Sequence, residues 1–314
     1  MRTPEGWTPD FLVLPHHSAK PRSHGITAVI DGGLPVAAMT AILDTGSAFC
    51  DVWKLGWGTA YLDPRLADKL TVLRRNQVSA CPGGTLLEVA ARQGRAEACL
   101  DWFAEVGFGW VEISNGMRAL SRRAKRELIM RASRDFTVVA EVGAKDPAVT
   151  LDVGAWVRTV TEDLDAGAER VITEGRESGT VGIFSPDGTV RVALVDALVS
   201  AVGADRLVFE APRKEQQAWF IRHLGPDVNL ANVAPSEIMG VEALRLGLRA
   251  DTVEMDVPFV ATEGPVATEV GVAGEVGVAD DGGVATDGGV AAEVGLAADG
   301  RMVGRGPSLR RWTT

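Results

Sequence analysis

The chain has 314 residues, of which 46% are hydrophobic and 24% are charged. These proportions are typical of a globular protein and exclude a fibrous or wholly disordered one. The formal net charge of −10 excludes the basic surface that nucleic-acid binding needs, so we expect no nucleic-acid partner. No apolar run is long enough to span a bilayer and the amino terminus lacks a signal-peptide pattern, so we also expect no membrane partner and a cytoplasmic location.

The three cysteines, Cys50, Cys81 and Cys99, are odd in number and show no CxxC spacing. This spacing predicts neither a disulfide framework nor a zinc site. The four histidines form no catalytic triad or metal-binding motif. Nucleophilic and zinc-dependent chemistry are therefore not indicated.

Residues 1–22 are interpreted as a flexible amino-terminal arm, and residues 23–252 as a catalytic domain. This domain alternates short β-branched runs with helical patterns, which predicts βα units around a parallel sheet. Eight strands in about 230 residues favour a single (β/α)8 TIM barrel. A doubly wound open sheet is the alternative, but residues 32–35 read GGLP and lack its GxGxxG fingerprint. The predicted strands are residues 26–31, 51–55, 77–81, 110–114, 137–142, 170–174, 207–210 and 228–232.

Helical patterns fill several of the gaps between these strands. The last one is well marked, because Ser236 stands where an N-cap is expected and Ile238, Val241 and Leu244 share one face. The predicted helices are residues 86–103, 121–132, 155–166, 190–202, 214–223 and 236–248.

Residues 253–314 have a different composition. From residue 257 to residue 300 the chain repeats units such as EVGVA and DGGVA, and residues 260–300 include no Lys, Arg or aromatic residue. So little material for a core predicts a disordered acidic tail rich in Gly, Ala and Val. A small β-solenoid is the alternative.

Carboxylates stand at the ends of four consecutive predicted strands. A buried parallel strand is a near-continuous apolar run, and barrel enzymes build their active sites where the strands end. Closure of the barrel would gather these side chains at one mouth, where a divalent cation such as Mg²⁺ would relieve their repulsion. Structural ion pairs with neighbouring Arg or Lys residues are the alternative. The candidate metal ligands are Glu112, Glu141, Glu174 and Glu210.

Four cations follow strands at the same predicted rim, and together they suit a doubly charged anion. Two loops add backbone N–H groups of the kind that bind phosphate. The cations are Lys54, Lys145, Arg176 and Lys214, and the loops contain Gly83, Gly84 and Thr85, and Arg176, Ser178 and Gly179.

At these same residues the sequence resembles the phosphosulfolactate synthase family. The resemblance covers about 230 residues in order, far more than a single motif. It includes HGITAVIDGGLP (24–35), DVWKLGWGT (51–59), PGGTLLEVA (82–90), GFGWVEISNG (107–116), EVGAKD (141–146), DLDAGAERVITEGRESG (163–179), VFEAPRKEQQ (208–217) and VNLANV (228–233).

This resemblance implies a (β/α)8 barrel, a homo-oligomer of three or more subunits, and Mg²⁺-dependent addition of sulfite to phosphoenolpyruvate. The implied product is (2R)-phosphosulfolactate, on the route to coenzyme M. Lys145 corresponds to the second lysine of the family's EVGKK segment and is the expected proton donor, with Glu141 and Lys54 as further catalytic residues. The expected anion-binding residues are Lys54, Arg176, Lys214, Gly83, Gly84, Thr85, Ser178, Gly179, Asn229 and Asn232.

Two positions depart from the family pattern. Gly32 stands where the family commonly has a lysine, and Ala144 replaces the first lysine of EVGKK. Each loss makes the mouth less positive, which leaves a changed nucleophile as a second hypothesis. A third is a non-enzymatic, stress-associated protein, since plant relatives of the family are linked to heat stress.

Overall fold

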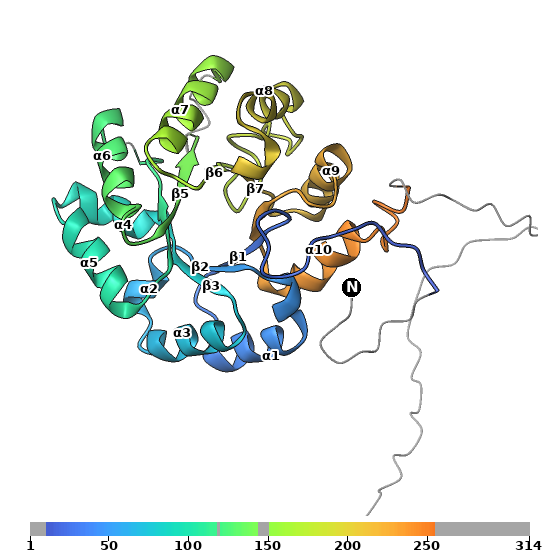
Figure 1. Cartoon of the computed structure of the whole chain (residues 1–314), viewed down its shortest axis with the longest axis horizontal. Coiled ribbons are helices and arrows are strands. Elements are labelled where there is room, and N and C mark those ends of the chain that lie inside the picture. Colours follow the sequence, from blue (N-terminus) through green and yellow to red (C-terminus); the bar gives the residue numbers. More distant parts are fainter. Residues whose placement is uncertain (1–10, 118–119, 144–150, 255–314) are drawn as a thin grey trace, which may run out of the picture. The chain divides into compact units, whose positions relative to one another are not determined.

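A computed structural model describes residues 11–117, 120–143 and 151–254. In this part of the chain eight parallel strands form one sheet, in the order β3-β2-β1-β8-β7-β6-β5-β4 (Figure 1). Because β1 pairs with β8, the sheet curls into a barrel. The strands are β1 Thr27–Asp31, β2 Val52–Leu55, β3 Ser79–Pro82, β4 Trp110–Ile113, β5 Thr137–Val142, β6 Arg170–Thr173, β7 Leu207–Glu210 and β8 Leu230–Val233.

The barrel closes between β3 and β4, which touch without forming a ladder of hydrogen bonds. Helices between the strands surround it, so the predicted (β/α)8 TIM barrel is confirmed and the doubly wound sheet is wrong. The helices are α1 Val36–Gly46, α2 Thr59–Leu62, α3 Leu66–Arg75, α4 Gly84–Arg92, α5 Ala96–Val106, α6 Arg122–Ala132, α7 Val153–Asp165, α8 Val192–Val202, α9 Lys214–Leu224 and α10 Ile238–Arg245.

Two helix predictions need correction. The single helix predicted over residues 86–103 is two helices, α4 and α5, because the chain turns at Gly94 with a φ of +67°. Ser236 is no N-cap, since it lies within a 3₁₀ turn, Pro235–Glu237, and α10 begins after it at Ile238.

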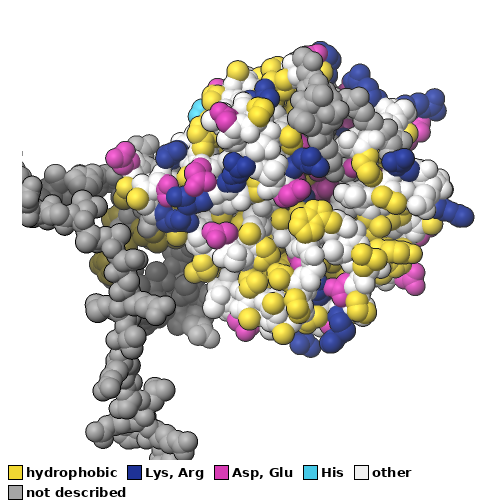
Figure 2. Space-filling view, turned by 180° about the vertical axis from the view of Figure 1, so that it is seen from behind, with side chains coloured by type: hydrophobic (Ala, Val, Ile, Leu, Met, Phe, Trp, Pro, Cys, Tyr) yellow, Lys and Arg dark blue, Asp and Glu magenta, His cyan; other side chains and the backbone are white. Residues whose placement is uncertain are grey.

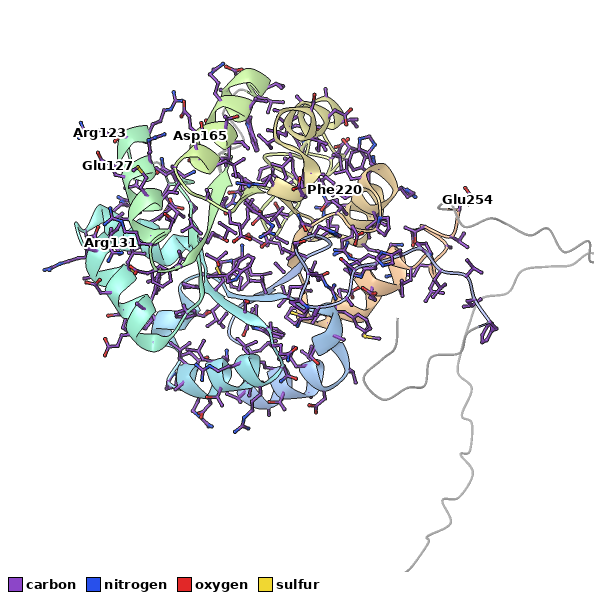
Figure 3. The ribbon with its side chains drawn as sticks, in the orientation of Figure 1. Arg123, Glu127, Arg131, Asp165, Phe220 and Glu254 are labelled. Atoms are coloured by element: carbon purple, nitrogen blue, oxygen red, sulfur yellow. The ribbon has the colours of Figure 1, made fainter. Side chains whose placement is uncertain are left out.

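The main hydrophobic core lies between the outward faces of the strands and the helices. Phe209 of β7 stacks on Phe220 of α9 with ring centroids 4.5 Å apart, and both side chains are fully buried. Phe220 is labelled on the inner side of α9 in Figure 3. Burial of one such side chain contributes roughly 1.5 to 3 kcal/mol.

A second, smaller apolar layer fills the interior of the barrel. Inward-facing side chains alternate with outward-facing ones along each strand. Trp110 lies inside with the small and branched side chains of the other strands. The remaining apolar residues of this layer are Ile26, Ala28, Val52, Cys81, Val139, Ile172, Val208 and Ala231.

Residues 11–25, which we call the amino-terminal segment, cover the end of the barrel where the strands begin. His17 is buried, and its ring nitrogens lie 2.8 Å from a carboxylate oxygen of Glu242 and 3.0 Å from the carbonyl oxygen of Gly25. Lys20 donates to the carbonyls of Ser47 and Cys50, before β2. In Figure 1 this segment is the dark blue trace beside α10.

The chain divides into two units, Met1–Phe259 and Val260–Thr314. The second unit, which contains most of the expected tail, lies outside the described residues. No helix of the described ranges is long and apolar enough to cross a membrane.

Candidate active site at the carboxyl ends of the strands

A charged layer lies above the apolar layer inside the barrel. It consists of five residues, four within strands and one directly after a strand. Each stands two positions after an inward-facing apolar residue, so that its side chain faces inward as well. All five residues are at least 93% buried. They are Lys54 of β2, Glu112 of β4, Glu141 of β5, Glu174 directly after β6, and Glu210 of β7.

Lys54 joins two of these carboxylates across the barrel. Its ammonium nitrogen lies 3.0 Å from Oε2 of Glu112 and 3.4 Å from Oε1 of Glu210. The other oxygen of each glutamate accepts hydrogen bonds from a loop: Gly84 N–H donates to Glu112 (2.9 Å), and the N–H groups of Gly175 and Arg176 donate to Glu210 (2.8 and 2.9 Å). We call Lys54, Glu112 and Glu210 the Lys54 bridge. It ties the start of α4 to the loop after β6.

The carboxylates of the Lys54 bridge shift the pKa of Lys54. Burial acts to lower the pKa of this ammonium, yet the nearby carboxylates of Glu112, Glu210 and Glu141 together hold the pKa above its usual value. The carboxylates of the bridge therefore favour the cationic form of Lys54. Burial also raises the pKa of the neighbouring Cys81 thiol, which stays protonated and is a poor nucleophile.

The four glutamates do not converge on one point. Among the described residues no three His, Cys, Asp or Glu side chains lie close enough together to hold a metal ion. Both oxygens of Glu112 and of Glu210 are already engaged in the Lys54 bridge. For Glu112 and Glu210, the structural ion pairs considered as the alternative to metal binding are therefore what the structure shows.

The two predicted anion-binding loops lie at this rim, next to the bridge. Gly83 is the N-cap of α4, and the N–H of Gly84 points at Glu112, so a carboxylate of the protein occupies this helix start; Thr85 follows, half-buried. In the second loop Arg176 is exposed with a φ of +55°, and Ser178 Oγ lies 2.8 Å from Thr180 Oγ1.

Buried Gln216 of α9 holds the end of this second loop, since its side-chain amide donates to the carbonyls of Gly179 and Gly188. Gln216 was not among the site residues predicted from the sequence. A glutamine in a helix is usually exposed, so its residue type gives little indication of a buried role.

The other predicted site residues are scattered. Lys214 pairs with Asp251 at 3.0 Å. Asn229 is not at the rim: its amide bonds to the backbone of Ile26 and Leu207, where strands begin. Asn232 is buried at the carboxyl end of β8, with a φ of +55° and a side-chain oxygen that has no hydrogen-bond partner. Such an atom at the rim of a site is a candidate ligand contact.

Lys145, the expected proton donor, lies outside the described residues, as does Ala144. The described chain leaves β5 through Gly143, whose φ is +142°. A Cβ on Gly143 would lie 2.3 Å from Cβ of Glu174, so the backbone passes directly over this glutamate. Lys145 follows Gly143 by two residues in the sequence.

Sequence reasoning also missed Glu88, a buried residue of α4. Its carboxylate accepts hydrogen bonds from the hydroxyl of Ser114 and from Met117 N–H (2.7 Å), and so it shapes the loop after β4. A buried glutamate within PGGTLLEVA carries no periodic signal that separates it from a surface glutamate.

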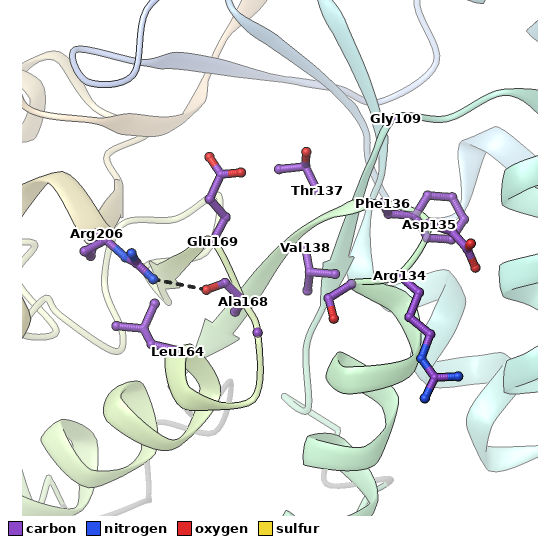
Figure 4. Close-up of a pocket in the computed structure, with 12 residues that line it drawn as sticks. Gly109, Arg134, Asp135, Phe136, Thr137, Val138, Leu164, Ala168, Glu169 and Arg206 are labelled. Carbon is purple, nitrogen blue, oxygen red and sulfur yellow. Dashed lines mark hydrogen bonds between the residues drawn. The ribbon is translucent and has the colours of Figure 1, made fainter.

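A hollow lies away from this rim. It is lined by residues that precede β4, β5, β6 and β7, among them Phe136, Glu169 and Arg206 (Figure 4). The guanidinium of Arg206 points to the carbonyl of Ala168 (3.4 Å), and Arg134 points away in the figure. Because barrel chemistry takes place at the opposite ends of the strands, we do not assign the active site to this hollow.

Comparison with known proteins agrees on one family. The family model described as (2R)-phospho-3-sulfolactate synthase matches residues 15–251. A phosphosulfolactate synthase of Bacillus subtilis (strain 168) is 39% identical over 247 residues, which cover 77% of this chain and 98% of that protein. One from Methanothermobacter thermautotrophicus is 40% identical over 250 residues, covering 78% and 96%. A shorter match of 94 residues, 28% identical, links 30% of the chain to 31% of the Arabidopsis thaliana protein HEAT-STRESS-ASSOCIATED 32.

Proposed function

Because this chain belongs to the (2R)-phospho-3-sulfolactate synthase family, we propose that it adds sulfite to phosphoenolpyruvate and forms the carbon–sulfur bond of (2R)-phosphosulfolactate. The structural observation that supports this reaction best is the buried charged layer at the carboxyl end of the barrel. Burial of four carboxylates and one ammonium is energetically costly, and a barrel with only a structural role would not need these groups at this end.

The proposed reaction is an addition across a double bond. The sulfur lone pair of sulfite attacks the methylene carbon, the electrons of the carbon–carbon double bond move toward the substrate carboxylate, and one proton is then delivered to the adjacent carbon. Lys54, whose pKa the neighbouring carboxylates hold above its usual value, would contribute a positive charge in a water-poor site. Lys145 remains our proposed proton donor, and Arg176, Ser178 and Asn232 our proposed anion contacts.

The residues at the rim fit Mg²⁺ in a restricted way. Mg²⁺ in proteins is usually held by one or two carboxylates together with substrate oxygens and water. With Glu112 and Glu210 engaged in the Lys54 bridge, we propose Glu141 and Glu174 as the ligands. The ion would stabilise negative charge on the substrate carboxylate.

The test is direct synthesis. Purified protein is incubated with phosphoenolpyruvate, sulfite and Mg²⁺, with and without chelator, and the product is identified by mass spectrometry. We expect a chelator-sensitive phosphosulfolactate signal, reduced roughly 10²- to 10⁴-fold by Lys145→Ala. Absence of product from a protein whose circular dichroism shows a folded barrel would refute the proposal.

Parallel incubations with thiols and other oxyanions in place of sulfite test the second hypothesis, a changed nucleophile. Gly32, which supplies no cation at the end of β1, is the observation that favours it. The homo-oligomer is a prediction of its own, which light scattering after gel filtration would check.

A further inference from the structure

A bulky apolar residue lies at the rim without being buried in a core. Trp57 follows β2 by two residues, and 56% of it is exposed. Its ring rests on Gly32: a Cβ on this glycine would lie 2.0 Å from Cζ3 of the indole and 2.8 Å from Cε3. Because Gly32 has no side chain, the indole ring of Trp57 can occupy the space that a Cβ would fill.

Gly32 lies at the carboxyl end of the barrel. The strand β1 ends at Asp31, whose carboxylate faces away from the barrel interior, toward Trp53 and Lys69. Gly32 follows in the bend directly beyond this strand. The indole that covers Gly32 therefore lies at the rim of the barrel mouth.

The backbone of Trp57 is unusual too. Its φ is +54°, a left-handed value that is sterically costly for a bulky residue. Gly56 and Gly58 flank it, and a Cβ on Gly56 would lie 2.9 Å from Cγ1 of Ile30. Conformations of this kind persist where the surroundings hold a side chain in one place, and they cluster at functional sites.

Trp57 is also connected to the charged layer. The Cβ position of Gly83 lies 3.3 Å from the Cα of Gly56 and 3.7 Å from the nitrogen of Trp57, and the next residue, Gly84, donates to Glu112 of the Lys54 bridge. Gly32, Gly56 and Gly83 directly follow β1, β2 and β3, whereas the ends of β4 to β7 carry carboxylates. Figure 2, which views the molecule from behind Figure 1, shows hydrophobic side chains beside acidic and basic ones near the middle of that face.

We propose that Trp57, seated on Gly32, contacts the substrate and forms the apolar wall on which the flat alkene carbons of phosphoenolpyruvate pack. This inference rests on the proposed function. All other groups of this substrate are anionic and belong on the polar side of the mouth. The planar CH₂=C unit is its only apolar part, and an indole offers a planar apolar face of matching shape. The contact would fix which face of the alkene meets the nucleophile.

Steady-state kinetics test the contact. Trp57→Ala should raise KM for phosphoenolpyruvate about tenfold, the equivalent of about 1.4 kcal/mol, with little change in kcat. Trp57→Phe should retain most of the affinity because it keeps a flat ring. Leu62→Ala is the matched control: Leu62 is 75% exposed on α2 and should leave both constants unchanged. An unchanged KM in Trp57→Ala, or a variant whose only defect is its oligomeric state, would overturn the inference.

A double-mutant cycle tests the seat. Gly32 does not have a left-handed φ, so Gly32→Ala alters only the space beneath the ring. We expect it to raise KM in the wild-type background and to have no further effect in the Trp57→Ala background. Additive effects would show that Gly32 acts independently of Trp57.

Fluorescence separates this inference from the proposed reaction. Phosphoenolpyruvate alone should change the intrinsic tryptophan fluorescence of the wild type but not that of Trp57→Phe. If this signal is present and no sulfonated product forms, the contact stands and the proposed reaction fails. A wild type without any Trp57-dependent signal overturns the contact even if product forms.

Discussion

Two lysines of this barrel have the same local chemistry and lie in different places. Lys54 lies between Glu112 and Glu210, at 3.0 and 3.4 Å, and Lys69 lies between Asp31 and Asp63, at 3.2 and 2.8 Å. Both are nearly inaccessible to solvent.

Their surroundings differ. Lys54 extends from β2 into the barrel, whereas Lys69 extends from α3 toward the outer side of β1. There Asp31 also accepts hydrogen bonds from Gly33 and Leu34 N–H, at 2.7 and 2.6 Å. A buried lysine between carboxylates is therefore no sign of catalysis by itself. What separates the two lysines is that Lys54 lies inside the barrel and Lys69 outside it.

The largest effect is expected from Lys54→Met. Removing one partner of a buried ion pair costs about 3 to 5 kcal/mol, and here it leaves two carboxylates uncompensated. We also expect kcat/KM per folded molecule to fall by about 10²-fold or more, since a positive charge is lost at the proposed reacting centre. Urea unfolding and product formation measure the two losses. Full activity in the folded fraction would mean that the Lys54 bridge is only structural.

Lys69→Met is the matched variant outside the barrel. Its free energy of unfolding should fall by a similar amount, about 3 kcal/mol, because Asp31 and Asp63 lose their shared cation. Its kcat/KM should stay within about threefold of the wild type once corrected for the folded fraction. A loss of turnover as deep as that of Lys54→Met would erase the distinction between the two lysines.

Glu210→Gln examines one arm of the Lys54 bridge. The amide oxygen can still accept the hydrogen bonds of Gly175 and Arg176, so the loop after β6 should keep its position. The attraction to Lys54 is weakened, which we expect to lower stability by about 1 to 2 kcal/mol and to change KM more than kcat. Comparison of the two constants with those of Lys54→Met would separate charge from loop position. Equal losses in both variants would contradict this ranking.

The smallest effect is expected where an ion pair is fully exposed. Arg123 and Glu127 form such a pair on α6, with nitrogen and oxygen 2.8 Å apart, and both are labelled on the outer side of the barrel in Figure 3. Solvent screening makes such pairs weak. Arg123→Ala should leave the melting temperature unchanged within error, at low and at high salt. A clear drop at low salt would show that burial is not what separates these pairs from the two lysines.

The strands could be predicted from the sequence because a buried parallel strand is a compact run of β-branched residues. Each of the eight falls within two residues of its predicted bounds. Helices α1 and α3 lie where no helix was predicted. Neither begins at a residue whose side chain caps it, so the usual start signal is missing.

The site could be predicted only in part. The glutamates were found because a carboxylate at the end of an apolar run is conspicuous. Their pairing with Lys54 could not be predicted, because Lys54 and Glu210 are 156 residues apart in the sequence and meet only when the barrel closes. Asp31 shows a different difficulty: it ends a strand just as the glutamates do, but strand alternation turns it outward to Lys69.

The arrangement of the amino-terminal segment has a consequence for the order of folding during synthesis. His17 meets Glu242, 225 residues later, and Gly25 N–H donates to the carbonyl of Asp227. Contacts between residues so distant in sequence form slowly, because a long loop must close first. During synthesis the amino-terminal segment leaves the ribosome long before Asp227 and Glu242. It therefore lacks these contacts while the intervening βα units emerge. Closing of the barrel is thus expected to be a late event, completed only after residue 242 has left the exit tunnel.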